Sequence, residues 1–292
     1  MAPPTLSIVA PVYNEARILS EFVGRCTRAA EQVDVPFELV IVDDASTDDT
    51  PAVLADLARD TRVRPCRGHA NVGQFRATQA GLHAARGELV VVIDGDLQDP
   101  PEHIPRLVEA LSAAPPAVMA VLAVKARRDD PAAFMVGQFV FHRLQHAFSR
   151  VAVPRGAGSY CVMRRTLAQR VARVALAHTN MAAVVAVAAR AVGGELATAP
   201  YDKGPRYDRS TRVGWQGLAA EALESLAITG ALSRLLGLLA VGLGASGLAA
   251  RSLPVGRWAM LGASAVAAVL SLGIGYRARR ALAPVWAPHA SP

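Results

Sequence analysis

Two carboxylates one residue apart are the part of this sequence that points most directly to chemistry. Asp94 and Asp96 follow Leu89–Ile93, an apolar run rich in β-branched residues that predicts a buried strand. We therefore expect both acids at the carboxyl end of a strand, where open α/β sheets bind ligands. Neighbouring anions repel each other unless a cation lies between them, and their oxygen atoms suit Mg²⁺ or Mn²⁺ on a diphosphate. A solvated acidic turn is the alternative interpretation of an isolated Asp-x-Asp.

Two earlier strand patterns end in polar turns of the same kind. Leu6–Ala10 is followed by the turn 11–15, and Phe37–Val42 by the acidic turn 43–50. The ends of parallel strands share one edge of a sheet. The sequence therefore predicts that both turns lie in one crevice with the acids at 94 and 96.

Five motifs, in order, make the chain resemble the family 2 glycosyltransferases with a GT-A fold. They are Pro11-Val12-Tyr13-Asn14-Glu15, Val42-Asp43-Asp44-Ala45-Ser46-Thr47-Asp48, Asn71-Val72-Gly73, Ala85-Arg86-Gly87 and Asp94-Gly95-Asp96-Leu97-Gln98-Asp99-Pro100-Pro101-Glu102. The extension 97–102 is similar to the polyprenyl-phosphate branch, which includes dolichol-phosphate mannose synthases and bacterial bactoprenol glucosyltransferases. The specific match covers residues 5–130 and a looser one the rest. The resemblance implies an α/β, Rossmann-like GT-A catalytic domain.

The resemblance also implies a role for individual residues. The nucleoside of the donor would be bound by Pro11, Tyr13, Glu15 and Asp44. Asp94, Asp96 and Gln98 would surround the diphosphate and a Mg²⁺ or Mn²⁺ cofactor. Positions 94, 96 and 98 would share one side of an extended segment, which agrees with that ligand set. The catalytic residues would be Asp94, Asp96, Lys125 and Arg128, the last two falling where the family carries phosphate-binding basic residues. An exposed basic run is the alternative for Lys125 and Arg128.

The acceptor side of the motif set is less regular. In the loop 156–165, Ser159 stands where the family usually has an acid, and Cys161 where it has an arginine. The acceptor phosphate is expected to contact Ser159, Arg206 and Ser210. A polyprenyl phosphate is already an anion at pH 7, so it can attack without a general base, whereas a hydroxyl acceptor needs one.

The enzyme expected from this chemistry is an inverting glycosyltransferase. It would move one sugar from a UDP- or GDP-sugar to a polyisoprenyl phosphate. The alternatives are a glycosyltransferase acting on a lipid or glycan hydroxyl and a catalytically silent membrane adaptor with the same fold.

The last third of the chain is apolar enough to predict a membrane anchor. Mean hydropathy is +0.27, with 52% hydrophobic and 19% charged residues. Residues 228–250 contain one charge, Arg234, and residues 258–276 contain none. Each run is long enough to cross a hydrocarbon core of about 30 Å. We therefore expect a two-helix transmembrane hairpin at 228–280 and a tail at 281–292, with a pair of buried helices as the alternative.

Two amphipathic segments should connect the sheet to this anchor. An aromatic cluster predicts a membrane-surface helix at 134–150, within a catalytic domain of residues 1–212. Apolar and acidic residues alternate at helical spacing in 213–227, which predicts a juxtamembrane helix. Small residues in the hairpin would permit a homo-oligomer through the transmembrane helices.

The distribution of charge agrees with a membrane partner. Residues 1–199 carry 21 basic and 20 acidic side chains, whereas residues 200–292 carry 10 and 4. Most of the net charge of +7 therefore lies beside the predicted anchor, where it would meet anionic lipids. No nucleic-acid partner is expected, because no recognition helix or stacking motif accompanies the charge. With no signal peptide pattern and three cysteines without metal spacing, we expect an integral membrane protein whose catalytic domain is in the cytoplasm, in the bacterial inner membrane.

Overall fold

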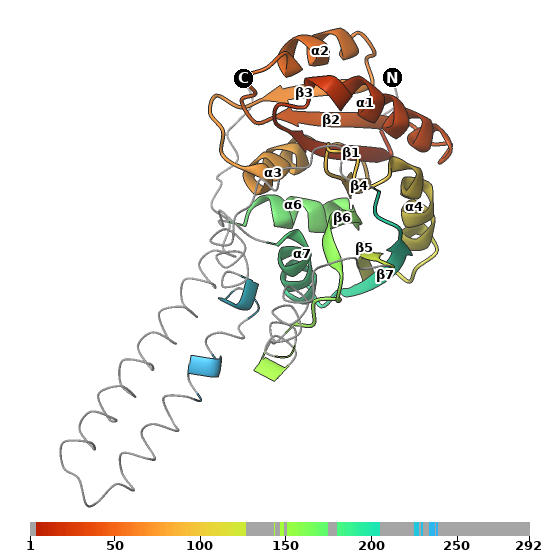
Figure 1. Cartoon of the computed structure of the whole chain (residues 1–292). Coiled ribbons are helices and arrows are strands. Elements are labelled where there is room, and N and C mark those ends of the chain that lie inside the picture. The colour runs from red at the N-terminus through yellow and green to blue at the C-terminus, as the bar shows by residue number, and fades with distance from the viewer. Residues whose placement is uncertain are drawn as a thin grey trace, which may run out of the picture.

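A seven-stranded mixed sheet forms the centre of the protein (Figure 1). The computed structural model describes residues 4–126, 143, 147–148, 151–174, 180–204, 225–227, 229, 234–236 and 238. The strand order is β3-β2-β1-β4-β6-β5-β7. The strands are β1 (Leu6–Val12), β2 (Phe37–Asp43), β3 (Val63–Arg67), β4 (Leu89–Val92), β5 (Val118–Lys125), β6 (Ala157–Arg164) and β7 (Glu195–Tyr201).

Helices cover both faces of the sheet and make a three-layer α/β/α fold (Figure 1). One face carries α1 (Ala16–Glu31), α2 (Thr50–Leu57), the short 3₁₀ helix η1 (Pro101–His103) and α4 (Ile104–Ser112). The other carries α3 (Gln74–Ala84), α6 (Arg165–Ala172) and α7 (Met181–Arg190). The central strands are buried on both faces, so neighbouring residues serve opposite cores: Ile8 packs beneath α1 and Val9 beneath α3.

Strand direction decides which loops meet at the edge where the predicted site lies. β1 pairs in parallel with β2 and β4, and β2 with β3. β6 runs antiparallel to β4 and β5, and β7 runs parallel to β5. Six strands therefore end at one edge, and β6 begins there. The predicted α/β fold of the GT-A kind is confirmed, as are the three strands expected before residue 95.

The Ala85-Arg86-Gly87 motif is a structural feature at the opposite edge. Ser7 on β1 donates a hydrogen bond to the buried Glu38 at 2.7 Å, and the Gly87 amide donates to the Ser7 hydroxyl at 2.8 Å. A Cβ atom on Gly87 would lie 2.6 Å from the Ser7 amide nitrogen. Arg64 neutralises Glu38 at 2.5 Å. Glycine is required here because the two backbones touch.

Most of the predicted membrane elements lie outside the described residues. These are the greater parts of the 134–150 helix, the 213–227 helix and the 228–280 hairpin, and the whole 281–292 tail. Within the part of the chain that the structure describes, no helix is both long and apolar enough to span a bilayer. Two described residues of these regions are in contact: an Arg234 guanidinium nitrogen donates to the Phe148 carbonyl at 3.5 Å.

Candidate active site

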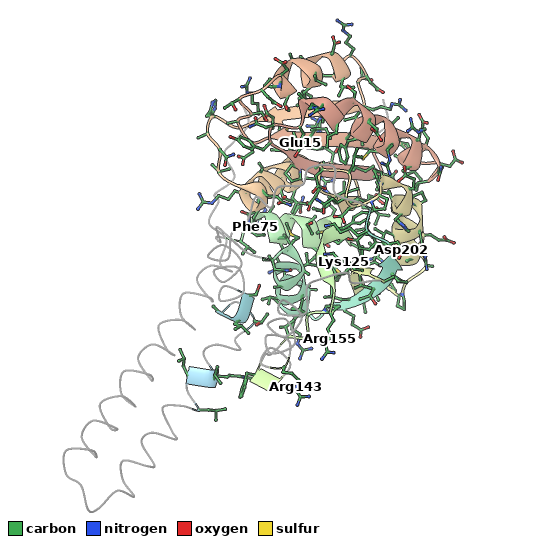
Figure 2. All side chains as sticks on the ribbon, viewed as in Figure 1. Glu15, Phe75, Lys125, Arg143, Arg155 and Asp202 are labelled. Atoms are coloured by element: carbon green, nitrogen blue, oxygen red, sulfur yellow. The ribbon has the colours of Figure 1, made fainter. Side chains whose placement is uncertain are left out.

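The turns after β1 and β2 are tied together by the first two sequence motifs. Asn14 has a left-handed backbone with φ of 55°, and its amide donates to the Ser46 hydroxyl at 2.9 Å. Its side-chain oxygen accepts the Thr47 amide at 2.8 Å. The Glu15 amide donates to the Thr50 hydroxyl at 2.9 Å. These contacts make one rigid wall at the carboxyl edge of the sheet, and Figure 2 marks Glu15 on it.

The four residues expected to bind the nucleoside all lie on or beside this wall. Pro11 is buried in β1, Tyr13 and Glu15 are half-buried just beyond it, and Asp44 is buried directly after β2. The structure therefore brings them to the same edge as Asp94. Their contact with a nucleoside stays a prediction.

Asp44 already has two backbone partners. Its Oδ1 accepts the Val72 amide and its Oδ2 accepts the Gly73 amide, each at 2.8 Å. Gly73, with φ of 89°, is the residue from which α3 begins. A carboxylate oxygen has a second lone pair, so a ligand can still be bound. Asp44 thus fixes the start of α3 to the end of β2.

Asp94 is held from two sides. Gln74, the first residue of α3, donates its amide to Oδ1 at 2.6 Å, and the Ser159 hydroxyl of β6 donates to Oδ2 at 2.9 Å. Ser159 is therefore hydrogen-bonded to Asp94, and its expected contact with the acceptor phosphate stays a prediction. Sequence analysis missed Gln74, although it directly follows the Asn71-Val72-Gly73 motif.

The segment that carries the acidic motif is a turn and not an extended strand. The expectation that positions 94, 96 and 98 alternate along an extended segment is wrong, because residues 95–96 form a turn and Leu97 is left-handed with φ of 59°. Leu97 is buried in the core, which holds it in that conformation. A Cβ atom on Gly95 would lie 2.6 Å from a Val12 methyl carbon. The close approach of β1 therefore shapes the turn.

The end of β7 fastens the far side of this turn. The Tyr201 hydroxyl donates to Asp99 Oδ1 at 2.6 Å, and Lys203 Nζ lies 3.9 Å from the same oxygen. The Gly204 amide donates to the Gln98 carbonyl at 2.8 Å. The sequence motifs gave no sign of these contacts.

The site carries more negative charge than its neighbours compensate. Burial raises the pKa of Asp94 to about 7, and the charges of Asp99 and Asp96 contribute to the rise. Burial also raises the pKa of Asp99, against the opposing charge of Lys203. Crowded carboxylates of this kind are stabilised by a shared cation.

The donor atoms fit a divalent cation shared with a substrate. Among the described residues, no three acidic, histidine or cysteine side chains are already assembled into a metal-binding group. Mg²⁺ is commonly bound through one or two carboxylates, with waters and substrate phosphates completing its coordination. Asp94 and Asp96 fit that pattern. Gln98 as a third ligand stays a prediction.

The basic residues expected in the site are only partly described. Lys125 ends β5, opposite Tyr201 of β7, and is exposed (Figure 2). Arg128, Arg206 and Ser210 lie outside the described residues. Their roles stay predictions.

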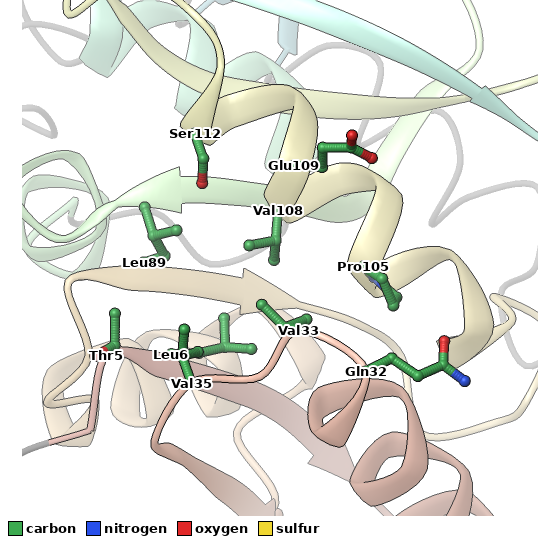
Figure 3. Close-up of a pocket in the computed structure, with 10 residues that line it drawn as sticks. All are labelled: Thr5, Leu6, Gln32, Val33, Val35, Leu89, Pro105, Val108, Glu109 and Ser112. Atoms are coloured by element: carbon green, nitrogen blue, oxygen red, sulfur yellow. The ribbon is translucent and has the colours of Figure 1, made fainter.

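A separate hollow of about 390 Å³ lies at the opposite edge of the sheet (Figure 3). The starts of β1 and β4 line it at Leu6 and Leu89, together with Val108 of α4. Glu109 is the one charged residue among its described lining residues. The hollow is distant from the acidic turn and takes no part in the site.

A family model identifies the class of protein. The model for glycosyl transferase family 2 matches residues 7–172, more than half of the chain. The chain therefore belongs to glycosyltransferase family 2.

Curated relatives within the family are similar over the first part of the chain. The undecaprenyl-phosphate 4-deoxy-4-formamido-L-arabinose transferase of Sodalis glossinidius is 46% identical over 106 residues, which are 36% of this chain and 32% of the relative. Its counterpart in Pseudomonas fluorescens is 43% identical over 106 residues, 36% of this chain and 31% of the relative. The match thus spans about a third of the length of these two relatives, both of which are polyprenyl-phosphate sugar transferases by name.

Solved structures share the fold at lower identity. The mannosyltransferase PcManGT from Pyrobaculum calidifontis, in complex with GDP-Man and Mn²⁺, has a TM-score of 0.52 at 24% identity, covering 96% of this chain and 74% of that one. Glucosyl-3-phosphoglycerate synthase from Mycobacterium tuberculosis, with Mn²⁺, UDP and glucosyl-3-phosphoglycerate, has a TM-score of 0.54 at 21% identity, covering 77% and 78%. Both support the GT-A-like architecture.

Proposed function

We propose that this glycosyltransferase moves one sugar, with inversion, from a UDP- or GDP-sugar to a polyisoprenyl phosphate. The observation that carries the proposal is the acidic turn 94–99, held at the carboxyl edge of the sheet between α3 and β7. Nucleotide diphosphates bind at this edge in open α/β sheets. The names of the curated relatives favour a polyprenyl phosphate as the acceptor.

The path of the chain supports an acceptor that lies in a membrane. The described chain runs out of the sheet up to Ala126 after β5 and up to Gly204 after β7. It returns to the sheet at Ala157, the first residue of β6. All three points lie at the edge that carries Asp94. Segments 134–150 and 213–280, predicted to contact or cross the membrane, are therefore attached at the edge with the acidic turn. An acceptor phosphate at the head-group plane would be close to that turn.

In the proposed reaction, a phosphate oxygen of the acceptor attacks the anomeric carbon of the sugar. The bond from that carbon to the nucleoside diphosphate breaks, and its electron pair leaves with the diphosphate. A bound divalent cation would neutralise charge on the leaving group. Asp94 and Asp96 would hold the cation, while Gln74 and Ser159 keep Asp94 in one orientation. Alignment of the two substrates supplies most of the remaining rate enhancement, because the attacking oxygen needs no base.

The partners in this proposal are a nucleotide sugar, a polyisoprenyl phosphate and membrane lipids. We propose that the catalytic domain works at the cytoplasmic face of a bacterial inner membrane. The hairpin would be the anchor and a contact between subunits.

A donor screen with the purified full-length protein tests the function. Radiolabelled UDP- and GDP-sugars are incubated with Mn²⁺ and undecaprenyl phosphate, and the label that enters the organic phase is counted. Undecaprenol is the matched control, since it differs from the acceptor by the phosphate alone. We expect transfer to the phosphate and none to the alcohol. Transfer to the alcohol would favour the hydroxyl-acceptor alternative, and the absence of both donor binding and transfer would favour the adaptor.

A further inference from the structure

Lys203 lies on the half of the site that faces away from the predicted nucleoside residues. In the sheet order, β1 and β2 lie on one side of β4, and β6, β5 and β7 lie on the other. The acidic turn follows β4 and separates the two halves. Lys203 comes two residues after the end of β7.

The backbone at Lys203 is fixed against the acidic turn. β7 pairs with β5 so that Tyr201 is opposite Lys125, and the Ala126 amide donates to the Tyr201 carbonyl at 2.9 Å. The next contact is the Gly204 amide on the Gln98 carbonyl. A Cβ atom on Gly204 would lie only 3.3 Å from that carbonyl oxygen. The chain thus passes along the turn with little room to shift.

Within the described part of the chain, the ammonium group of Lys203 has one ion pair and no hydrogen bond. Its distance of 3.9 Å from Asp99 Oδ1 allows an ion pair but is too long for a hydrogen bond. That oxygen already accepts the Tyr201 hydroxyl. The Lys203 side chain is 29% exposed, so its three N–H donors can reach a ligand at the mouth of the site.

An anionic acceptor needs a cation at this place. It must approach Asp94, Asp96 and Asp99, whose charges repel it. Among the described residues, Lys203 lies within ion-pair distance of Asp99, and Lys125 ends the neighbouring strand β5. A phosphate oxygen could belong to the donor diphosphate or to the acceptor, and the position beyond β5 favours the acceptor.

We propose that Lys203 binds the phosphate of the acceptor and holds it in line with the sugar. This assignment rests on the proposed function. It adds to the predicted acceptor residues one that the family motifs do not mark.

Steady-state kinetics of the full-length protein test the proposal, with undecaprenyl phosphate in detergent, Mn²⁺ and the donor found by the screen. In Lys203→Met we expect the KM for undecaprenyl phosphate to rise about tenfold or more, the value of one hydrogen bond to a charged group. The KM for the donor should stay within about twofold. Lys203→Arg should recover most of the acceptor affinity, because it keeps the charge.

Two further variants separate direct contact from indirect effects. Asp202→Asn changes an exposed charge on the neighbouring residue, and its acceptor KM should stay within about twofold if the effect is local. Tyr201→Phe removes the hydroxyl from Asp99 and leaves the ammonium in place. An acceptor KM raised as much in Tyr201→Phe as in Lys203→Met would show that Lys203 acts by holding the turn, and would overturn the contact.

The remaining outcomes are also decisive. An equal loss of donor affinity would assign Lys203 to the donor diphosphate and overturn the proposal. An unchanged acceptor KM in Lys203→Met would overturn the proposal for Lys203. Transfer by the wild-type protein would still support the proposed function. A wild-type protein that transfers to no polyisoprenyl phosphate would overturn the proposed function, and this inference with it.

Discussion

Asp94 is the residue whose surroundings say most about the chemistry of the site. Both of its oxygens accept hydrogen bonds from neutral side chains, Gln74 and Ser159. An acid in place of Ser159 would add another negative charge beside Asp94, Asp96 and Asp99. The hydroxyl instead orients Asp94 without increasing the repulsion in the turn.

Ser159→Asp should therefore make the protein depend on a divalent cation for stability. Without a cation we expect the free energy of unfolding to fall by about 1–3 kcal/mol, because a second carboxylate is placed against Asp94. Saturating Mn²⁺ should restore most of the loss, since a cation bound by both carboxylates stabilises the folded state. Thermal unfolding with and without Mn²⁺ measures the effect.

Ser159→Ala is the control for this variant. It loses one hydrogen bond, worth about 1 kcal/mol, and this deficit should not change with Mn²⁺. If Mn²⁺ also leaves the deficit of Ser159→Asp unaltered, that result would contradict a cation site at Asp94.

Asp96→Asn should lower turnover at least about a hundredfold at saturating Mn²⁺ and donor. The amide keeps the size of the side chain and its acceptor for the Gln98 amide, but it removes the charge that a cation needs. Initial rates across a Mn²⁺ titration measure the loss, and the exposed Asp202→Asn is a matched charge control. Full wild-type activity in excess EDTA would argue against the metal.

The sequence predicted the charged centre of the site but not the residues that hold it. Asp94 and Asp96 are recognisable because a short apolar strand precedes them in an ordered set of motifs. Tyr201 and Lys203 come more than a hundred residues later and reach Asp99 through the pairing of β7 with β5. Such partners depend on strand order, which local patterns do not encode. The left-handed Leu97 was missed for the same reason, since the core enforces its conformation.

At the scale of elements, the backbone at Gly87, just before β4, lies directly against the backbone of β1. Gly87→Ala should lower the free energy of unfolding by about 2–4 kcal/mol, because its Cβ would overlap the backbone of Ser7 in β1. Chemical denaturation measures the loss. Gly158→Ala in β6 is the control: a Cβ atom there meets nothing within 4 Å, so we expect a change within about 0.5 kcal/mol. Equal effects would show that β1 is not closely packed at Gly87.

Glu102, the last residue of the long acidic motif, connects two elements. Its carboxylate oxygens accept two hydrogen bonds from Arg25 of α1, at 2.8 and 2.7 Å. These bonds hold the pKa of Glu102 below its usual range. The side chain is 54% exposed, so solvent weakens the pair.

Glu102→Gln should cost about 0.5–1 kcal/mol of stability at pH 7 and leave turnover within about twofold. A carboxyl group with a lowered pKa stabilises the fold above its unfolded pKa of about 4.3 and loses this effect as the pH falls through its folded value. The deficit should therefore shrink in acid. A double-mutant cycle with Arg25→Ala measures the coupling. Each variant is denatured chemically at pH 7 and again in acid, below the folded pKa of Glu102. A large fall in turnover would instead give this acid a chemical role.

At the scale of the whole molecule, the two cores that the described residues form are built from residues before 202. Removing residues 228–292 should thus keep the unfolding temperature within a few degrees. We expect only partial release from membranes, because the predicted surface helix 134–150 is retained. Transfer to a long-chain polyprenyl phosphate should fall more than transfer to a short, water-soluble one, since misplacement by about 1 Å can cost about a hundredfold.

Sedimentation with vesicles and paired acceptor assays measure both effects of the truncation. If the truncated protein is fully released and equally active on both acceptors, the hairpin serves only to anchor the protein and does not position the acceptor. This result would also argue against contact between residues 134–150 and lipid.

The position of β6 in the sheet has a consequence for the order in which the molecule is assembled during synthesis. β6 lies between β4 and β5, so β5 has no neighbour in the sheet until the later strand has been made. β1 to β4 need no such wait and can pair as they leave the ribosome, because domains form from the N-terminal side. β7 is added last, on the outer edge of β5, and brings Tyr201 to Asp99. We therefore expect nascent chains that stop before residue 195 to contain paired β1 to β4 and an acidic turn that is not yet fastened, so that the ability to bind a cation is acquired only after β7 has been made.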